Sequence, residues 1–294
     1  MSDGPARWRL VIGAGEGVTS AAAPEPLPGA RNMAVDQALF ESVQAGGVPV
    51  LRLYRWRPAC LSFGRNQRAR GIYDPAVLLA AGIDVVRRPT GGLAVLHDGE
   101  LTYAVIAPAG PLGGPRAAYL AINEALVRAL RALGVPASIG AGAGTRVPSP
   151  DARHPCFERP APGEVVALGR KLVGSAQRVE RHTILQHGSI LRTGDQQAVL
   201  RLQSGTGAGA VTTRLEGAAS GAVALAAPAR PGEITLAEVL GGPPGWAVLG
   251  AALQRAFEVR LGIALAPAPL SVDERTRTAA LEGSFGANPW TWRR

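Results

Sequence analysis

The segment between residues 83 and 106 limits the fold most strongly, because it holds three strand-like runs with very short connections. Residues 83–88 lead into Pro89-Thr-Gly-Gly92, residues 93–97 follow at once, and Asp98-Gly99 connects them to residues 100–106. Asp-Gly is a two-residue turn that typically joins antiparallel strands in a hairpin. The segment therefore predicts a sheet in which neighbouring strands run in opposite directions.

Strand and helix patterns alternate along the rest of the chain. Alternating or apolar runs predict strands at 8–12, 50–56 and 61–64, and apolar residues spaced by three or four predict helices at 32–45, 75–81, 116–133 and 246–261. Thr235-Leu-Ala-Glu238 and Ser271-Val-Asp-Glu274 both have the spacing of a capping box at a helix start. We expect one α/β domain over residues 1–294, in which residues 233–294 form a small helical C-terminal layer. The Gly- and Ala-rich stretches at 138–150 and 203–231 predict a loop and a surface excursion.

Lys171 is the only lysine among the 31 basic residues of the chain. Arginine cannot lose its proton and presents a wide planar fork, whereas lysine is a compact charge whose pKa moves readily on burial. Residues 170–179 alternate as a strand, which predicts that Lys171 shares a face with Ser175 and that Gly174 marks a close approach of a ligand or backbone. The alternative is that Lys171 lies on a solvated strand face without a chemical role.

Cys156 lies fifteen residues upstream, on a segment bracketed by Pro155 and Pro160. These prolines predict a short constrained loop. A thiolate is the reactive form of cysteine, and a nearby lysine favours it, but the residues alone do not show that the two side chains meet. A small buried thiol is the alternative for Cys156 and the simplest interpretation of Cys60. Two cysteines give neither a disulfide framework nor the spacing of a metal site.

The formal net charge of +9 and the isoelectric point near 10.8 favour acidic partners. Nucleic acid is a poor candidate, because the arginines are dispersed and only 5% of residues are aromatic. No segment has the length and apolarity of a signal-peptide core or a membrane span, so we expect a cytoplasmic protein without a membrane partner. A non-catalytic basic binding protein remains one alternative.

Three blocks of the sequence resemble the lipoate-protein ligase family. Arg87-Arg-Pro-Thr-Gly-Gly92 followed by His97-Asp98 is similar to its Arg-Arg-x-Ser/Thr-Gly-Gly…His-Asp signature. Gly169-Arg-Lys-Leu-Val-Gly-Ser-Ala-Gln177 and Ile184-Leu-Gln-His-Gly-Ser-Ile190 match a second block. The similarity runs from Asn32 to Trp292, and thus covers nearly the whole chain.

Within that family, Pro155-Cys-Phe-Glu-Arg-Pro160 resembles the Ala-Cys-Phe-Asp-x-Pro segment of the protein octanoyltransferases. Pro155 replaces Ala, Glu158 replaces Asp, and Leu93 stands where relatives often have Arg or Gly. The resemblance implies that Cys156 carries the octanoyl group as a thioester and that Lys171 assists it. The alternative within the family is an ATP-dependent lipoate ligase, which forms an acyl-adenylate and needs no cysteine.

The resemblance also implies the biotin/lipoate protein ligase catalytic fold, a mixed, mostly antiparallel sheet with flanking helices. It implies no cofactor or metal, with ATP and Mg²⁺ needed only in the ligase alternative. The implied partners are octanoyl-acyl carrier protein as donor and lipoyl domains as acceptors, such as glycine cleavage H protein or dehydrogenase E2. The implied substrate-binding residues are Arg87, Arg88, Thr90, Gly91, Gly92, His97, Gly174, Ser175, Ala176, His187 and Gly188.

Overall fold

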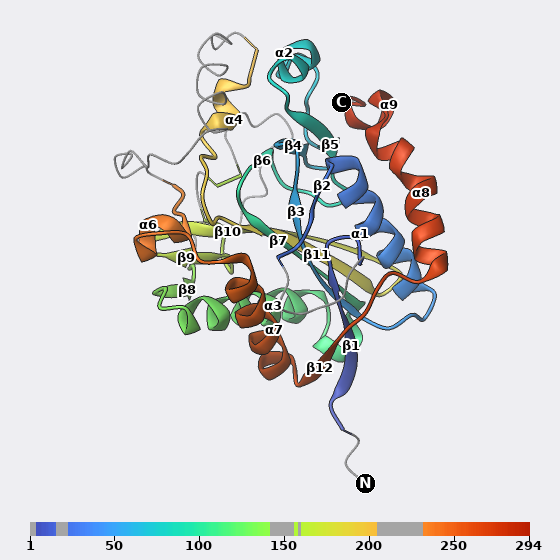
Figure 1. Ribbon diagram of the computed structural model, residues 1–294, viewed down its shortest axis with the longest axis vertical. Coiled ribbons are helices and arrows are strands. Elements are labelled where there is room, and N and C mark those ends of the chain that lie inside the picture. The colour runs from blue at the N-terminus through green and yellow to red at the C-terminus, as the bar shows by residue number, and fades with distance from the viewer. Residues whose placement is uncertain (1–3, 16–22, 142–155, 158–159, 205–231) are drawn as a thin grey trace.

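The structure is a computed structural model that describes residues 4–15, 23–141, 156–157, 160–204 and 232–294 (Figure 1). Most of the predicted loop at 138–150 and of the predicted excursion at 203–231 lies outside the described residues. The strands are β1 (Ala6–Ile12), β2 (Pro26–Leu27), β3 (Val50–Trp56), β4 (Cys60–Phe63), β5 (Asp84–Arg87), β6 (Val95–His97), β7 (Leu101–Pro108), β8 (Ala137–Ile139), β9 (Val165–Ala167), β10 (Arg170–Glu180), β11 (Thr183–Ile190) and β12 (Ile263–Pro267). The helices are α1 (Gly29–Gln44), α2 (Pro75–Ala80), the short η1 (Gly110–Leu112), α3 (Pro115–Ala132), α4 (Ala198–Arg201), α6 (Leu236–Leu240), α7 (Trp246–Leu261), α8 (Val272–Gly286) and α9 (Asn288–Thr291).

The described strands form a large sheet and a small one. The large sheet has the order β12-β1-β3-β7-β11-β10-β9-β8, with β2 beside β3, and the small sheet has the order β5-β4-β6. The pairs from β3 through β7, β11, β10 and β9 to β8 are antiparallel, whereas β12–β1, β1–β3 and β4–β5 are parallel. The prediction of a mixed, mostly antiparallel sheet with flanking helices is therefore confirmed.

The predicted hairpin at Asp98-Gly99 is wrong. The chain does turn there, with Gly99 at φ +88, but β6 pairs with β4 of the small sheet and not with β7. Strand β7 pairs with β3 on one edge and β11 on the other, so neither edge is free for β6. The turn thus carries the chain from one sheet into the other.

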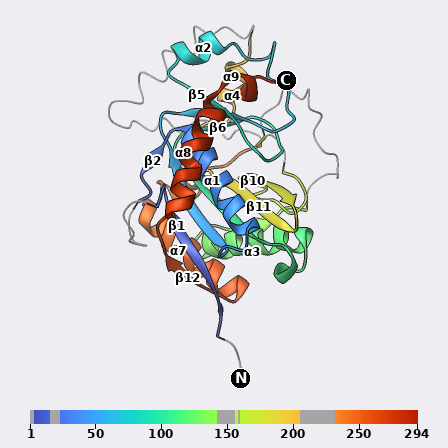
Figure 2. The same ribbon diagram turned by 90° about the vertical axis from the view of Figure 1, so that its right-hand side faces the viewer.

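Helices cover both faces of the large sheet. Alternate residues of β7 face α3 and α7 (Leu101, Tyr103, Val105), while Ala104 and Ile106 face α1. Helix α7 packs on α3, and α8 packs on α1, as Figure 2 shows from the side of α1 and α8. The large sheet thus has a hydrophobic core on each face, and these two cores hold β10 and β11, which carry several of the predicted site residues.

The expected C-terminal helical layer needs correction. Residues 263–267 form β12, which pairs in parallel with β1 at the edge of the large sheet, and α7 and α8 lie on opposite faces of that sheet. The run after Gly262 follows directly on a predicted helix and ends in proline, and only pairing with β1 completes its backbone hydrogen bonds. Both predicted capping boxes are present, at Thr235–Glu238 and Ser271–Glu274.

No helix among the described residues is long and apolar enough to cross a membrane.

A buried charge network joins α1 to the sheet below the site. The Asp36 carboxylate accepts hydrogen bonds from Arg52 at 2.6 Å and from the Tyr54 hydroxyl at 2.8 Å, and it lies 3.1 Å from His187 Nδ1. Burial alone would raise the pKa of Asp36, but the charge of Arg52 and the hydrogen bond with His187 outweigh it, so this pKa is lowered. The carboxylate therefore stabilises the fold above its unfolded pKa, and this stability is lost as the pH falls through the lowered folded pKa.

Replacing Asp36 by asparagine is expected to lower the free energy of unfolding by about 3–5 kcal/mol, because it leaves the Arg52 charge buried without a carboxylate. Denaturant titration measures this loss, and the difference from wild type should shrink as the pH is lowered toward 3. Exposed Asp273→Asn on α8 is the matched control. If Asp36→Asn loses no more stability than Asp273→Asn, the Asp36 carboxylate does not stabilise the fold through its pairing with Arg52.

Candidate active site

Cys156 and Lys171, whose contact the sequence leaves open, lie next to each other. The Lys171 ammonium, 2% exposed, donates a hydrogen bond to the Cys156 carbonyl oxygen at 2.8 Å and lies 3.8 Å from Cys156 Sγ. The thiol itself is half-buried and free. The one lysine of the chain therefore brings its charge to the one free thiol on this loop.

Glu164 completes this arrangement and was missed from the sequence. Its Oε1 accepts a hydrogen bond from Lys171 at 2.8 Å, and its Oε2 accepts one from the Ala161 backbone at 2.7 Å. A buried ammonium needs a carboxylate partner, and Glu158 and Glu164 are the only acids between Cys156 and Lys171. That requirement was the signal available in the sequence.

The predicted face of Lys171 is wrong, because the pairing of β10 with β9 shifts register between Lys171 and Val173. Ser175 bonds with Tyr103 at 2.7 Å on the α3 side of the sheet, whereas the Lys171 ammonium lies 5.1 Å from the centre of the Phe157 ring. Phe157 packs directly on Gly174, where an added Cβ would lie 2.7 Å from the ring. Gly174 thus marks a close approach, but the approaching group is the side chain of Phe157, the residue after Cys156, whereas the sequence predicted a ligand or another backbone.

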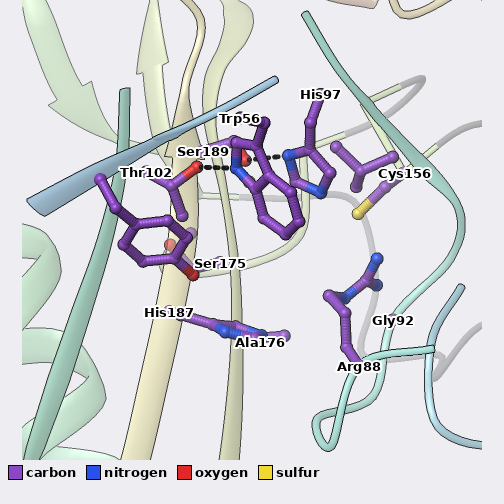
Figure 3. A pocket seen from close by; sticks show the side chains of 14 residues that line it. Trp56, Arg88, Gly92, His97, Thr102, Cys156, Ser175, Ala176, His187 and Ser189 are labelled. Carbon is purple, nitrogen blue, oxygen red and sulfur yellow. Dashed lines mark hydrogen bonds between the residues drawn. The ribbon is translucent and has the colours of Figure 1, made fainter. Parts of the chain in front are cut away.

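A small cavity of ≈ 30 Å³ lies between the two sheets (Figure 3). Eight of the predicted substrate-binding residues line it together with Cys156: Arg88, Gly92, His97, Gly174, Ser175, Ala176, His187 and Gly188. Tyr54, Trp56, Val95, Thr102 and Ser189 complete the lining and were not predicted. The cavity is small, and Cys156 forms part of its lining.

Trp56 and His97 form one wall of this cavity. Their rings are stacked, with 3.9 Å between centroids and 13° between planes, and the Trp56 indole donates to the Thr102 hydroxyl at 2.8 Å. His97 is held by Glu100 at 2.6 Å and Ser62 at 2.6 Å, and burial lowers its pKa although Glu100 opposes the shift. The apolar face of Trp56 suits a hydrocarbon chain.

The two arginines of the Arg-Arg motif point to different places. Arg88 lines the cavity on the side of the Cys156 sulfur (Figure 3), and it donates to the carbonyl oxygens of Gly91 and Leu93. Burial lowers the pKa of Arg88, and the Cys156 sulfur partly counteracts this. Arg87 does not line the cavity, because consecutive strand residues face opposite sides. It donates instead to the Thr291 and Gly64 carbonyl oxygens.

Thr90 and Gly91 also lie outside the cavity lining. The Thr90 hydroxyl is 2.6 Å from His187 Nε2, so it holds the opposite side of the ring that contacts Asp36. The Gly91 carbonyl accepts from Arg88 at 3.1 Å. An added Cβ at Gly64 would overlap the Gly92 carbonyl oxygen, which shows how tightly this loop lies on β4. The loop is therefore shaped by the residues around it.

Residues 28–239 match the family model of the lipoyl protein ligase A/B catalytic domain. The chain belongs to this family. The solved structure of a lipoate-protein ligase A bound with ATP has the same fold, with a TM-score of 0.71 and 22% identity over 97% of this chain and 98% of that one. A Thermoplasma acidophilum putative lipoate protein ligase with bound lipoic acid also gives 0.71, with 21% identity over 97% and 99%.

Two curated relatives are more similar in sequence, and both are named octanoyltransferase LipM. The protein of Kyrpidia tusciae is 38% identical over 90% of this chain and 94% of its own length. That of Symbiobacterium thermophilum is 37% identical over 91% and 95%. The predicted family and the predicted class of enzyme, an octanoyltransferase, are confirmed.

Proposed function

We propose that this octanoyltransferase takes its acyl group from octanoyl-acyl carrier protein, holds it as a thioester on Cys156 and passes it to the lysine of a lipoyl domain. The observation that supports this most directly is the Lys171 ammonium 3.8 Å from Cys156 Sγ, beside a cavity with an apolar wall. An ATP-dependent adenylation site has no need for a thiol at this position.

In the first step, Cys156 Sγ attacks the thioester carbonyl carbon of the donor. The new carbon–sulfur bond forms on Cys156, the donor's carbon–sulfur bond breaks, and the donor leaves as a thiol that takes up the proton given up by Cys156. The attacking form of the sulfur is the thiolate, and Lys171 and Arg88 place positive charge beside it during the attack. Lys171 is held in place by Glu164 and the Cys156 carbonyl.

In the second step, the neutral lysine amine of the acceptor attacks the Cys156 thioester. The amide forms, the bond to Cys156 breaks, and the amine proton returns to the thiol. No ATP is consumed, because a thioester already holds its acyl group in an activated state. Lipoyl domains are the acceptors, and we propose glycine cleavage H protein and dehydrogenase E2 as members of that class. A free Cys156 thiol fits the cytoplasm, where thiols stay reduced.

The test is octanoyl transfer from octanoyl-acyl carrier protein to a purified lipoyl domain, with and without ATP and Mg²⁺. Transfer without ATP supports the proposal. The second candidate is an ATP-dependent lipoate ligase, favoured by the fold shared with the ATP-bound ligase. It predicts no transfer from the thioester donor, and attachment of free octanoate only when ATP is present.

Replacing Glu164 by glutamine is expected to reduce transfer about tenfold or more, because it removes the negative charge that positions the Lys171 ammonium. Initial rates of transfer measure the effect. Glu238→Gln is the matched control, since Glu238 pairs with Arg170 at the exposed start of β10 and glutamine preserves its capping box. Equal rates for the two variants would contradict the role of Glu164.

A further inference from the structure

Two arginines lie over the ring of Trp246, outside the catalytic cavity, and the charge of a third, Arg57, acts on one of them. The Arg55 guanidinium lies 4.0 Å and the Arg192 guanidinium 4.2 Å from the centre of the Trp246 ring. Arg57 follows two residues after Arg55 and is exposed. We call Arg55, Arg57, Arg192 and Trp246 the arginine cluster.

The arginine cluster contains no carboxylate. Among the described residues, none of its arginines takes part in an ion pair, and their hydrogen bonds go to backbone carbonyls: Arg55 to Pro24 at 3.4 Å and Arg192 to Pro244 at 2.7 Å. Burial lowers the pKa of Arg55, and Arg57 lowers it further; burial and Arg55 do the same to Arg192. Like charges held together in this way attract an anionic ligand.

Glu100 is the acid that partly offsets the charge on Arg55. Its side chain is buried and bonded to His97 at 2.6 Å, so it does not neutralise the exposed part of the arginine cluster. The stacking on Trp246 holds both guanidiniums in fixed positions. The surface is thus positive and rigid before any partner arrives.

The arginine cluster lies at the same end of the sheet as the catalytic pair. Ile190 pairs with Val173, and the Leu191 backbone donates to Leu172, so Arg192 lies near the first residues of β10, which include Lys171. Trp56 lines the cavity, whereas the preceding residue, Arg55, faces the other side of β3 and lies over Trp246. A protein bound to the arginine cluster would therefore sit at the end of the sheet that carries Cys156 and Lys171.

We propose that the arginine cluster is the docking surface for the acidic face of the carrier protein that donates the octanoyl group. This inference rests on the proposed function. Charge complementarity favours the donor over the acceptor: the donor brings a neutral thioester on a phosphate-linked arm, whereas the acceptor brings a lysine side chain that is cationic until it reacts. Positive charge at this end of the sheet attracts the first and repels the second.

The experiment compares two octanoyl donors with the full-length enzyme: octanoyl-acyl carrier protein and the small thioester octanoyl-pantetheine. The variants are Arg57→Glu and Arg192→Gln, and the matched control is Arg255→Glu, an exposed arginine further along α7. Intact mass spectrometry follows the rate of acyl-enzyme formation at donor concentrations below saturation. With the carrier protein we expect a fall of about tenfold or more for Arg57→Glu, and a weaker dependence on salt, because electrostatic docking is lost.

With octanoyl-pantetheine we expect rates within about twofold of wild type, since no carrier surface takes part. Equal losses with both donors, or an equal loss in Arg255→Glu, would overturn the docking assignment while leaving the proposed function intact. If the variants form acyl-enzyme at the wild-type rate but need a higher lipoyl-domain concentration for transfer, the arginine cluster binds the acceptor and the inference is overturned. If wild type forms no acyl-enzyme from either donor, the proposed function and the inference fail together.

Discussion

Replacing Cys156 by serine is expected to reduce octanoyl transfer by about three orders of magnitude or more, because a serine hydroxyl is far less ionised than a thiol. The half-buried position and the similar size of serine should leave the fold unchanged. Transfer from octanoyl-acyl carrier protein to a lipoyl domain, followed by mass spectrometry of the acceptor, measures the loss.

Cys60→Ser is the matched control. Cys60 is fully buried, and burial raises its pKa well above the ordinary value, with Asp84 and Glu100 adding to the shift. We expect this variant to keep its transfer activity and to lose only about 1–2 kcal/mol of stability. Wild-type transfer by Cys156→Ser would contradict the thioester route and favour the ATP-dependent alternative.

Replacing Lys171 by arginine is expected to lower transfer about a hundredfold with the fold retained. The ammonium fits between the Glu164 carboxylate and the Cys156 carbonyl, each 2.8 Å away, in a site that is 2% exposed. A planar guanidinium is wider than this site and cannot give up a proton.

Steady-state kinetics with the carrier-protein donor measure this effect, and circular dichroism checks that the fold persists. Arg170→Lys, at the preceding residue of β10, is the matched control and should behave as wild type, because Arg170 forms a weak, partly exposed pair with Glu238. Wild-type turnover of Lys171→Arg at neutral pH would show that any positive charge suffices.

The local patterns of the sequence were enough for most helices and strands. Helix α7 spans the predicted residues 246–261, and β3 spans the predicted residues 50–56, because apolar spacing and helix-ending glycine act within a few residues. The partners of each strand depend on residues far away. The Asp98-Gly99 turn is compatible with a hairpin, and only the occupied edges of β7 prevent one.

The same distinction applies to the site. Lys171 and Cys156 could be selected from the sequence, because one is the only lysine and the other lies between prolines. Their contact could not be predicted, since it depends on the register shift in β10 and on Phe157 packing against Gly174. Trp56 was missed because its pattern marks an ordinary strand residue; its stacking on His97 joins the ends of two different sheets.

The most direct test of the thioester route is the intact mass of the enzyme after incubation with octanoyl-acyl carrier protein and no acceptor. We expect one added octanoyl group, located on the peptide that contains Cys156, removed by hydroxylamine and transferred when a lipoyl domain is supplied. An adduct on Cys60, or transfer that proceeds while no adduct forms, would contradict the assignment of Cys156.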